Sequence, residues 1–428
     1  MGRARRVFGF NVIAHASGNF GLAVAARNTL RMLTTRGERA CVLDVDAGGG
    51  RFGHDLTFRA FECAERPLPW GVNLFHINPP DAVVLGADQP RAVSLAGRLN
   101  AAVPFWELPS LPRRDWAPML DAVDLVLAPS RHIQRVVERF CPAARIRHYP
   151  QAVFLPDGVS ADRSVWGLPD GAFVVFFGMD VSSDVERKNP MAVFEAFRAA
   201  FPPGGAADAV LAVKFNNAAV APRFERDGAD LVARFSSDPR VRIFTGNVPY
   251  RDALGLNAAC DVCLSLHRAE GLGLNLMEAM SLGKPVVATG WSGNTDFMTA
   301  ENSCPVAFRM VRVRTDHPSY KSAADEVEQE WADADIGDAA RRLRALYENV
   351  ESRRAIGDAA RARMDEARAL FLRGEWVDDL RREFESGAAA SPDHTRRAAR
   401  LKAVLKPGWK RSARRHVGNL LRRLGLRK

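Results

Sequence analysis

Long hydrophobic runs are missing from this sequence of 428 residues. Its longest apolar stretches reach about ten residues before a charged or turn-forming residue, whereas a helix that spans a bilayer needs roughly 20. We therefore expect no transmembrane helix. The opening residues, MGRARRVFGFNVIAH, place basic side chains before an apolar run, as a signal peptide does, but no small-residue cleavage site follows. We interpret residues 6–14 as a first buried strand.

Cysteine is also scarce. The six cysteines are scattered through apolar surroundings, without the density of a disulfide scaffold. They are Cys41, Cys63, Cys141, Cys260, Cys263 and Cys304. The pair Cys260 and Cys263 has the spacing of half a zinc site, but no second cysteine pair or histidine pair completes it. We therefore expect a reducing, cytoplasmic setting and no metal ion.

The body of the chain lacks a large net charge of either sign, although the whole carries +10. Residues 391–428 hold 13 of the 60 basic residues and one of the 50 acidic residues, which leaves 47 basic and 49 acidic residues elsewhere. The basicity therefore belongs to the C-terminal tail and says nothing about chemistry in the body.

Strand-like and helix-like segments alternate along most of the chain, which predicts parallel α/β sheets. Strands are expected in the segments NLFHINPP, VPFWELP and DLVLAPS, and a new series begins at residues 173–180. A stretch bearing proline and glycine separates the two series near residue 160. The length of the chain also suits two cores better than one.

The predicted fold is therefore two doubly wound, Rossmann-like domains that face a central cleft. We place the first domain at residues 1–160 and the second at residues 161–345. Residues 346–390 are rich in Ala, Arg, Glu and Leu, and we expect them to form helices that pack back on the domains. Residues 391–428 form the basic tail.

The segment from residue 266 to residue 297 carries the most informative pattern. Glu270 follows a strand, Gly271 and Gly273 let a backbone approach a ligand, and a helix begins near Leu274. The N-terminus of such a helix attracts phosphate. Glu278 lies about one turn into the helix, so that both carboxylates reach one ligand. The alternative is two solvated charges beside an ordinary amphipathic helix.

This segment resembles the donor site of retaining glycosyltransferase family four, which has the GT-B fold. The family mark is a Glu, seven residues and a second Glu, followed by Ala-Met and Gly-Lys-Pro. All of it is present, as Glu270, Glu278, Ala279, Met280, Gly283, Lys284 and Pro285. The resemblance implies a nucleotide diphosphate-sugar co-substrate, no cofactor or metal, and transfer with retention.

The resemblance also implies that the first domain is on the acceptor side and the second on the donor side, and it implies roles for single residues. Glu270 would contact hydroxyls of the transferred sugar, and Glu278 would hold the ribose. The backbone amides of Gly271, Leu272, Gly273 and Leu274 would face the diphosphate. Arg187 and Lys188 would meet the leaving diphosphate, although Met179 stands where many relatives carry an arginine. A solvated basic turn is the alternative for this pair.

Candidates in the first domain rest on weaker patterns. Gly18, Asn19 and Gly21 form a loop that relatives use near the donor phosphates, although any turn between a strand and a helix uses glycine. Glu107, in PFWELPSLP, is a candidate for acceptor binding, with a structural Trp-Glu pair as the alternative. His15 and His76 lie at expected strand ends, where α/β sheets bind ligands, but each is also typical of a hydrogen-bonded loop histidine.

The expected function is therefore transfer of a sugar, as by a hexosyltransferase, to a glycan or lipid-linked acceptor in polysaccharide or glycolipid assembly. Residues 396–428 mix basic residues with Leu, Val and Trp409, which suits an anionic membrane surface at the inner face. A disordered basic extension is the alternative, and we expect no nucleic-acid partner. Two alternative hypotheses for the function are a noncatalytic nucleotide-sugar-binding partner of another transferase and a GT-B epimerase.

Overall fold

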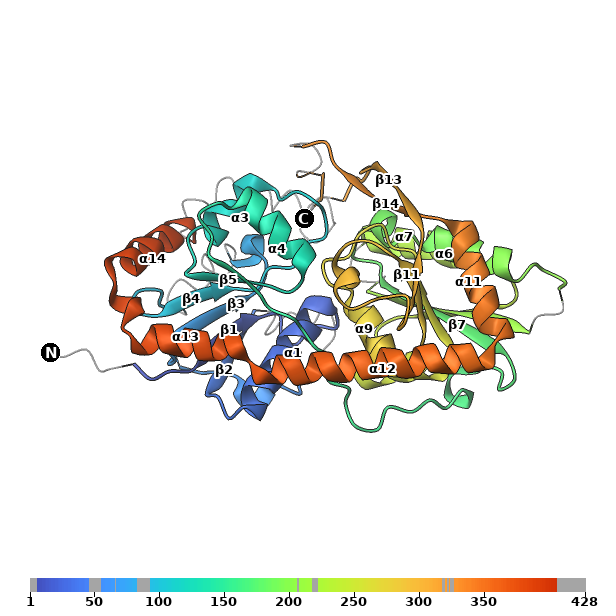
Figure 1. The fold of residues 1–428 in the computed structure, drawn as a ribbon, viewed down its shortest axis with the longest axis horizontal. Helices are drawn as coiled ribbons and strands as arrows, with labels where there is room; N and C mark the ends of the chain where they lie inside the picture. The colour runs from blue at the N-terminus through green and yellow to red at the C-terminus, as the bar shows by residue number, and fades with distance from the viewer. Residues whose placement is uncertain are drawn as a thin grey trace.

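The computed structural model describes residues 6–45, 55–65, 67–82, 93–205, 208–217, 222–317, 320–321, 323 and 327–405. Two six-stranded sheets organise these residues, and they lie side by side (Figure 1). Within each sheet all strand pairs are parallel. The predicted α/β fold with two doubly wound domains is therefore confirmed.

The first sheet has the strand order β2-β1-β3-β4-β5-β6. Its strands are β1 (Phe10–Ala14), β2 (Ala40–Asp44), β3 (Val72–His76), β4 (Leu99–Ala102), β5 (Leu125–Ala128) and β6 (Ile146–His148). The helices of this domain include α1 (Gly21–Thr35), α3 (Arg113–Leu120) and α4 (Arg131–Phe140). Because helices cover both faces of a parallel sheet, its inner strands β1, β3, β4 and β5 are buried throughout.

The second sheet has the order β12-β11-β10-β7-β8-β9. Its strands are β7 (Phe173–Asp180), β8 (Ala209–Asn216), β9 (Val241–Thr245), β10 (Val262–Ser265), β11 (Val286–Thr289) and β12 (Cys304–Val306). Its helices are α5 (Val185–Lys188), α6 (Pro190–Ala200), α7 (Pro222–Phe235), α8 (Tyr250–Ala259) and α9 (Leu274–Ser281). The first sheet ends at β6 and the second begins at β7, so residue 160 lies in the segment that connects them.

Two local expectations are corrected. The strand expected in VPFWELP is a loop, and the strand is the preceding segment β4, LNAA. The strand expected over residues 6–14 begins only at Phe10. In both places pairing with neighbouring strands, rather than local apolar content, decides which residues enter the sheet.

An antiparallel hairpin interrupts the second domain where the sequence indicated none. It consists of β13 (Phe308–Arg312) and β14 (Glu330–Ala334). The segment between these strands reaches the first domain, where the ring of Tyr320 lies 5.4 Å from that of Trp106. Trp331 belongs to the same hydrophobic cluster as Trp106. Figure 1 shows the hairpin above the junction of the two domains.

Three helices follow and return the chain to the first domain. They are α11 (Ile336–Glu348), α12 (Val350–Arg373) and α13 (Glu375–Glu385). The side chain of Asn349 caps the N-terminus of α12, and Gly374, with φ +61°, ends it. Trp376, Val377 and Leu380 of α13 pack in the hydrophobic cluster of β1 and β3. Figure 1 shows α12 along the second domain and α13 beside the first.

The basic tail begins as a docked helix, α14 (Pro392–Val404), instead of a solvated or membrane-bound extension. Ala398, Leu401 and Val404 are buried in the first domain's core cluster. Nδ1 of His394 lies 2.9 Å from Oδ1 of Asp124. The expectation for residues 396–428 is therefore corrected over α14, and residues 406–428 lie outside the described residues.

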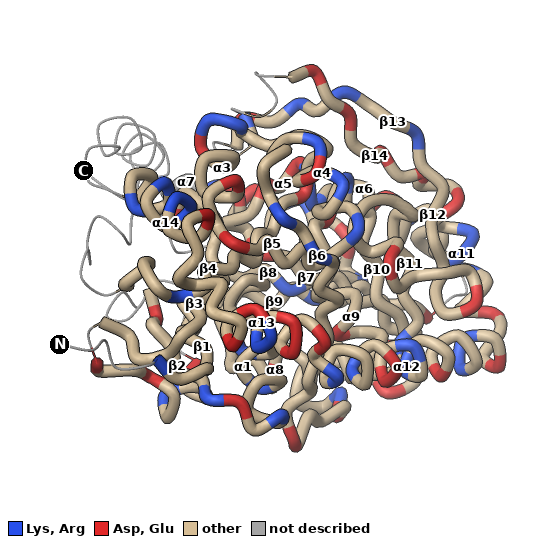
Figure 2. The backbone as a smooth tube through the Cα atoms, turned by 60° about the vertical axis from the view of Figure 1, so that its left-hand side comes forward, with Lys and Arg blue, Asp and Glu red and all other residues tan. Residues whose placement is uncertain are grey.

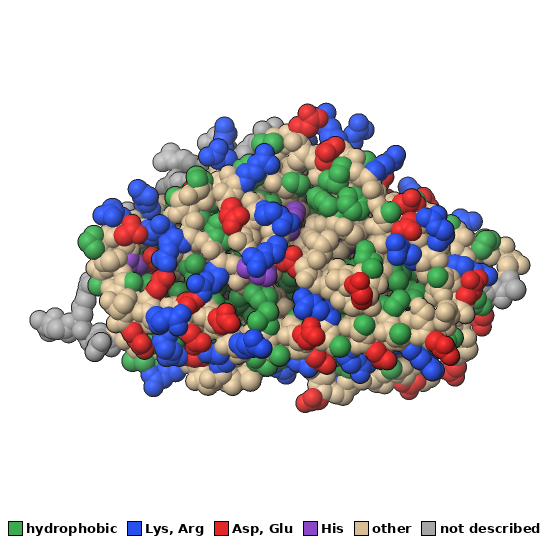
Figure 3. Space-filling view, in the orientation of Figure 1, with side chains coloured by type: hydrophobic (Ala, Val, Ile, Leu, Met, Phe, Trp, Pro, Cys, Tyr) green, Lys and Arg blue, Asp and Glu red, His purple; other side chains and the backbone are tan. Residues whose placement is uncertain are grey.

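Charges of both signs are mixed over the visible face of the body (Figure 3), whereas Lys and Arg lie along α14 (Figure 2). None of the helices described is long and apolar enough to cross a membrane.

Candidate active site

The loop between β10 and α9 brings the backbone of the predicted donor site to the junction of the domains. Gly273 has φ +91°, a left-handed conformation that favours glycine, and α9 begins at the next residue. The carbonyl oxygen of Gly271 accepts a hydrogen bond of 2.5 Å from Oγ of Ser130 in the first domain. A Cβ atom at Gly293 would lie only 2.0 Å from that same oxygen. The loop is therefore held from both sides.

Glu270 lies in this loop at 7% exposure, beside two cations from α5. Its Oε1 accepts a hydrogen bond from Nζ of Lys188 and lies 3.4 Å from Nη1 of Arg187. Burial by itself would raise the pKa of Glu270, but Lys188 and Arg187 outweigh it and lower the pKa to about 2. The structure thus brings Glu270, Lys188 and Arg187 together as a charged cluster.

Arg187 is buried between two carboxylates. It is only 3% exposed, its Nη1 donates to the carbonyl oxygen of Ala269 at 2.7 Å, and its Nη2 lies 3.9 Å from Oε1 of Glu107. Glu270 lies on its other side, 3.4 Å from Nη1. Contact of Arg187 with a leaving diphosphate stays a prediction, and Lys188 is the more exposed candidate on α5.

Glu107 lies in the same cluster but is engaged by the hairpin segment. The hydroxyl of Tyr320 donates to its Oε2 at 2.9 Å, and its backbone oxygen lies 2.8 Å from Nε2 of His132. Burial raises the pKa of Glu107, against the opposing effect of Arg187. Sequence reasoning missed Tyr320, because no pattern linked its segment to the cleft.

Glu278 occupies the face of α9 that meets α8. The hydroxyl of Tyr250, the first residue of α8, donates to its Oε1 at 2.8 Å. Burial raises the pKa of Glu278 to about 7, although the bond from Tyr250 and the charge of Arg27 oppose the rise. Neither Tyr250 nor Arg27 was identified from the sequence, since both come from distant segments.

The predicted glycine loop of the first domain lies against the second domain. Nδ2 of Asn19 donates to the carbonyl oxygen of Val248 at 3.4 Å. Within the loop, the side chain of Asp44 accepts from the backbone of Ala16 at 2.9 Å and from Oγ of Ser17 at 2.6 Å. The loop that contains Gly18 and Asn19, followed by Gly21 at the start of α1, thus faces the elements that carry Tyr250 and Glu278.

The two histidine candidates differ. Nε2 of His15 lies 3.5 Å from Asp81, and its ring packs against Phe20. His76 is 0% exposed, and its Nε2 lies 3.1 Å from Oγ1 of Thr29. Burial lowers the pKa of His76 to about 3. The side chain of His76 is thus enclosed in the core, and its contact with an acceptor stays a prediction.

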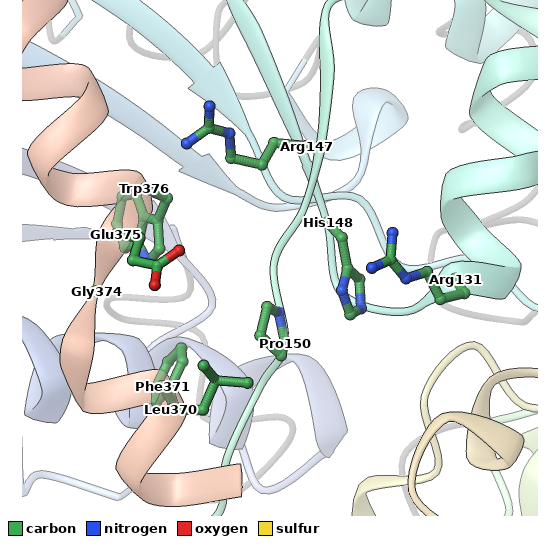
Figure 4. A pocket seen from close by; sticks show the side chains of 9 residues that line it. All are labelled: Arg131, Arg147, His148, Pro150, Leu370, Phe371, Gly374, Glu375 and Trp376. Carbon is green, nitrogen blue, oxygen red and sulfur yellow. The ribbon is translucent and has the colours of Figure 1, made fainter.

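A separate pocket of about 520 Å³ lies where β6 and α4 meet the junction of α12 and α13 (Figure 4). It is lined by Arg131, Arg147, His148, Pro150, Leu370, Phe371, Gly374, Glu375 and Trp376. Asp296 of the second domain contacts its edge, accepting from the backbone of Arg131 at 2.7 Å and lying 3.5 Å from Nε2 of His148. No predicted site residue lines this pocket.

Comparison with known families supports the assignment of the second domain. Residues 218–313 match the family model described as glycosyl transferases group 1. The matched segment contains Glu270, Glu278 and the loop between β10 and α9. A search of curated proteins finds no significant match to the chain.

Solved structures with the same architecture cover between 74% and 90% of the chain. Sucrose-phosphate synthase from Thermosynechococcus elongatus has a TM-score of 0.61, covers 90% of this chain and 100% of its own, and is 15% identical. HepE from Anabaena, solved in complex with UDP-glucose, has a TM-score of 0.59 with the same coverage and identity. α,α-Trehalose 6-phosphate synthase from Burkholderia multivorans has a TM-score of 0.52, covers 74% and 72%, and is 14% identical. These likenesses show the GT-B fold, and with the group 1 match they support a glycosyltransferase.

Proposed function

We propose that this chain transfers a sugar from a nucleotide diphosphate-sugar to an acceptor hydroxyl, with retention of anomeric configuration. The observation that carries the proposal is the contact between Lys188 of α5 and Glu270, in the loop before α9, with Glu278 on α9 itself. In this proposal Glu270 binds sugar hydroxyls, Lys188 binds phosphate and Glu278 binds the ribose.

The arrangement suits departure of a phosphate. Cleavage of the bond between the anomeric carbon and the phosphate oxygen develops positive charge on the sugar and negative charge on the phosphate. The free amides at the start of α9 and the ammonium group of Lys188 stabilise that negative charge. The acceptor oxygen bonds to the anomeric carbon from the same face, and its proton passes to the leaving phosphate oxygen.

Glu270 has a second role in this scheme. Its low pKa keeps it ionised at neutral pH, so that it accepts hydrogen bonds from the sugar. Its contact with Lys188 also holds the ammonium group beside the loop that would face the diphosphate. Closure of the two domains around the donor would exclude water and limit hydrolysis.

A ligand panel tests this proposal. UDP, GDP, their sugars and the corresponding monophosphates are compared by thermal shift with EDTA present, because a ligand that binds the folded state raises its apparent stability. We expect one nucleotide series to raise the melting temperature of the wild type and to do so less in Glu278→Gln. If no nucleotide or nucleotide sugar raised it, the proposal would fail.

We also propose that the acceptor is a glycan or lipid-linked glycan at an anionic membrane. Residues 406–428 contain nine Lys and Arg and no acidic residue, which favours attraction to anionic lipid. The docking of α14 on the first domain supports the proposal, because it anchors this basic segment on the acceptor side.

A further inference from the structure

A nucleotide diphosphate carries more negative charge than one lysine balances, and the charges near Glu270 are already paired. Lys188 contacts Glu270, and Arg187 lies between Glu270 and Glu107. A second cation from elsewhere in the cleft would therefore add charge that these pairs do not supply. Arg27 of α1, in the first domain, has the required position and an unused donor.

Arg27 is held rigidly by the glycine loop. Its Nη1 donates to the carbonyl oxygens of Ala16 and Gly18, at 2.7 and 2.8 Å, and its Nε lies 3.2 Å from Oδ2 of Asp55. The side chain is only 9% exposed. Its Nη2 is buried and has no hydrogen-bond partner among the described residues. Nη1 and Nε of Arg27 are thus engaged by three oxygen atoms, and Nη2 is a charged donor without an acceptor in the described part of the chain.

The same guanidinium faces the second domain. Its Cζ lies 6.0 Å from the centre of the Tyr250 ring, and the hydroxyl of Tyr250 is bonded to Glu278. Asn19, which follows the Gly18 bonded to Arg27, contacts Val248 across the domain boundary. Arg27 therefore lies between the glycine loop and the carboxylate proposed to hold the ribose, which is where the diphosphate of a bound donor would pass.

Burial of a guanidinium with an unpaired N–H is unfavourable unless something compensates it. Asp55 balances part of the charge, but burial still lowers the pKa of Arg27. An anionic oxygen beside Nη2 would supply the missing hydrogen-bond acceptor and balance the remaining charge of the guanidinium. Arginine is well suited to this, because its planar fork binds phosphate oxygens while its other donors remain fixed.

We infer that Arg27 is a phosphate-binding residue for the donor, supplied by the first domain and directed at the diphosphate through its free Nη2. The inference rests on the proposed function. Because Lys188 and α9 belong to the second domain, a diphosphate held by Arg27 as well would bridge the two domains. Binding of the donor would then itself favour the closed cleft.

The test separates the contribution of the second phosphate from that of the rest of the nucleotide. Dissociation constants for UDP and UMP, or for GDP and GMP if guanine is preferred, are measured by calorimetry on the full chain. Arg27→Gln is compared with Arg31→Gln, which alters an exposed arginine one turn further along α1. Arg27→Lys is the second variant, because it keeps the charge if Arg27→Gln folds poorly.

We expect the wild type and Arg31→Gln to share the same preference for the diphosphate over the monophosphate. In Arg27→Gln this preference should fall by about tenfold, the effect of losing one charge-assisted hydrogen bond, and Arg27→Lys should lose less of it. If Arg27→Gln kept the wild-type preference for the diphosphate, or bound both nucleotides more weakly by the same factor, Arg27 would only support the loop. Either result would overturn the inference. Absence of nucleotide binding in the wild type would instead defeat the proposed function.

Discussion

Glu270 and Glu278 belong to one segment, yet their pKa values move in opposite directions. Burial raises both, but Lys188 and Arg187 bring the pKa of Glu270 down to about 2, whereas Tyr250 and Arg27 leave that of Glu278 at about 7. The difference arises because Glu270 directly contacts a cation and Glu278 contacts a neutral hydroxyl. Glu270 is thus ionised at neutral pH, whereas Glu278 titrates near neutral pH.

This difference predicts how stability depends on pH. Because the folded pKa of Glu278 is raised, the folded chain holds its proton between about pH 4.5 and 7, where the unfolded chain has lost it. This group therefore makes the free energy of unfolding fall as pH rises through that window, by at most about 3 kcal/mol. Chemical denaturation of wild type and Glu278→Gln between pH 5 and 8 measures it. A variant with the same pH slope as the wild type would contradict the assignment.

Turnover should respond differently from binding when Glu270 is changed. Glu270→Gln keeps the shape of the side chain but removes the charge that contacts Lys188 and the proposed sugar hydroxyls. We expect a fall in kcat of about 10²- to 10³-fold, with a smaller effect on nucleotide affinity, since the lost interaction acts on the reacting sugar. Single-turnover assays with the donor identified by the ligand panel measure the first quantity, and calorimetry with the free nucleotide measures the second. A loss confined to affinity would reverse the proposed roles of Glu270 and Glu278.

At the scale of elements, the site depends on the close approach of two loops. The segment of Gly293, after β11, leaves no room for a side chain beside the carbonyl oxygen of Gly271. The backbone amide of Gly293 also donates to the carbonyl oxygen of Glu270 at 2.9 Å. The position of the loop before α9 is therefore set by the loop that follows the neighbouring strand.

Gly293→Ala should displace the loop before α9. The added methyl group has to push backbone rather than a flexible side chain, so we expect a loss of about 1–3 kcal/mol in stability and weaker nucleotide binding. Gly171→Ala is the matched control, because a Cβ there meets nothing within 4 Å. Denaturant titration and calorimetry on both variants measure the two effects. Equal behaviour of the two alanine variants would show that the loop adapts without cost.

At the scale of the whole molecule, two segments join the domains in addition to the connection between β6 and β7. The hairpin segment reaches Glu107, and α12 leads into α13 on the first domain, where α14 then docks beside α3. Ion pairs accompany this packing, such as Arg36 with Asp378 at 2.7 Å. The basic segment that follows α14 thus starts from the first domain.

Removal of residues 406–428 should abolish attraction to anionic lipid and leave the body intact. The deletion retains all of α14, so its buried contacts remain. We expect the full chain to co-sediment with vesicles containing phosphatidylglycerol, less so as salt is raised, and not with neutral phosphatidylcholine vesicles. The shortened chain should remain in the supernatant and keep its melting temperature. Equal sedimentation of both chains would locate lipid binding elsewhere or exclude it.

The sequence by itself determined many of the elements and the part of the site that is contiguous along the chain. A strand end, a glycine turn and a helix start follow one another around Glu270, and the helical repeat then places Glu278, so local spacing is sufficient. Pro190 likewise marks the start of helix α6 locally, because proline suits the first turn of a helix. Strand β4 was not predicted, because LNAA has little strand preference of its own and forms through pairing with β3 and β5.

Only the tertiary structure decided the partners of those residues. Tyr320 and Glu107 are 213 positions apart in the chain, and Tyr250 meets Glu278 through the packing of α8 on α9. It also showed that Arg187 is enclosed between two carboxylates, that His76 lies in the core and that α14 is docked. The physical reason is that periodicity reports which side of an element is buried, whereas the charge and exposure of a side chain depend on what the rest of the fold places against it.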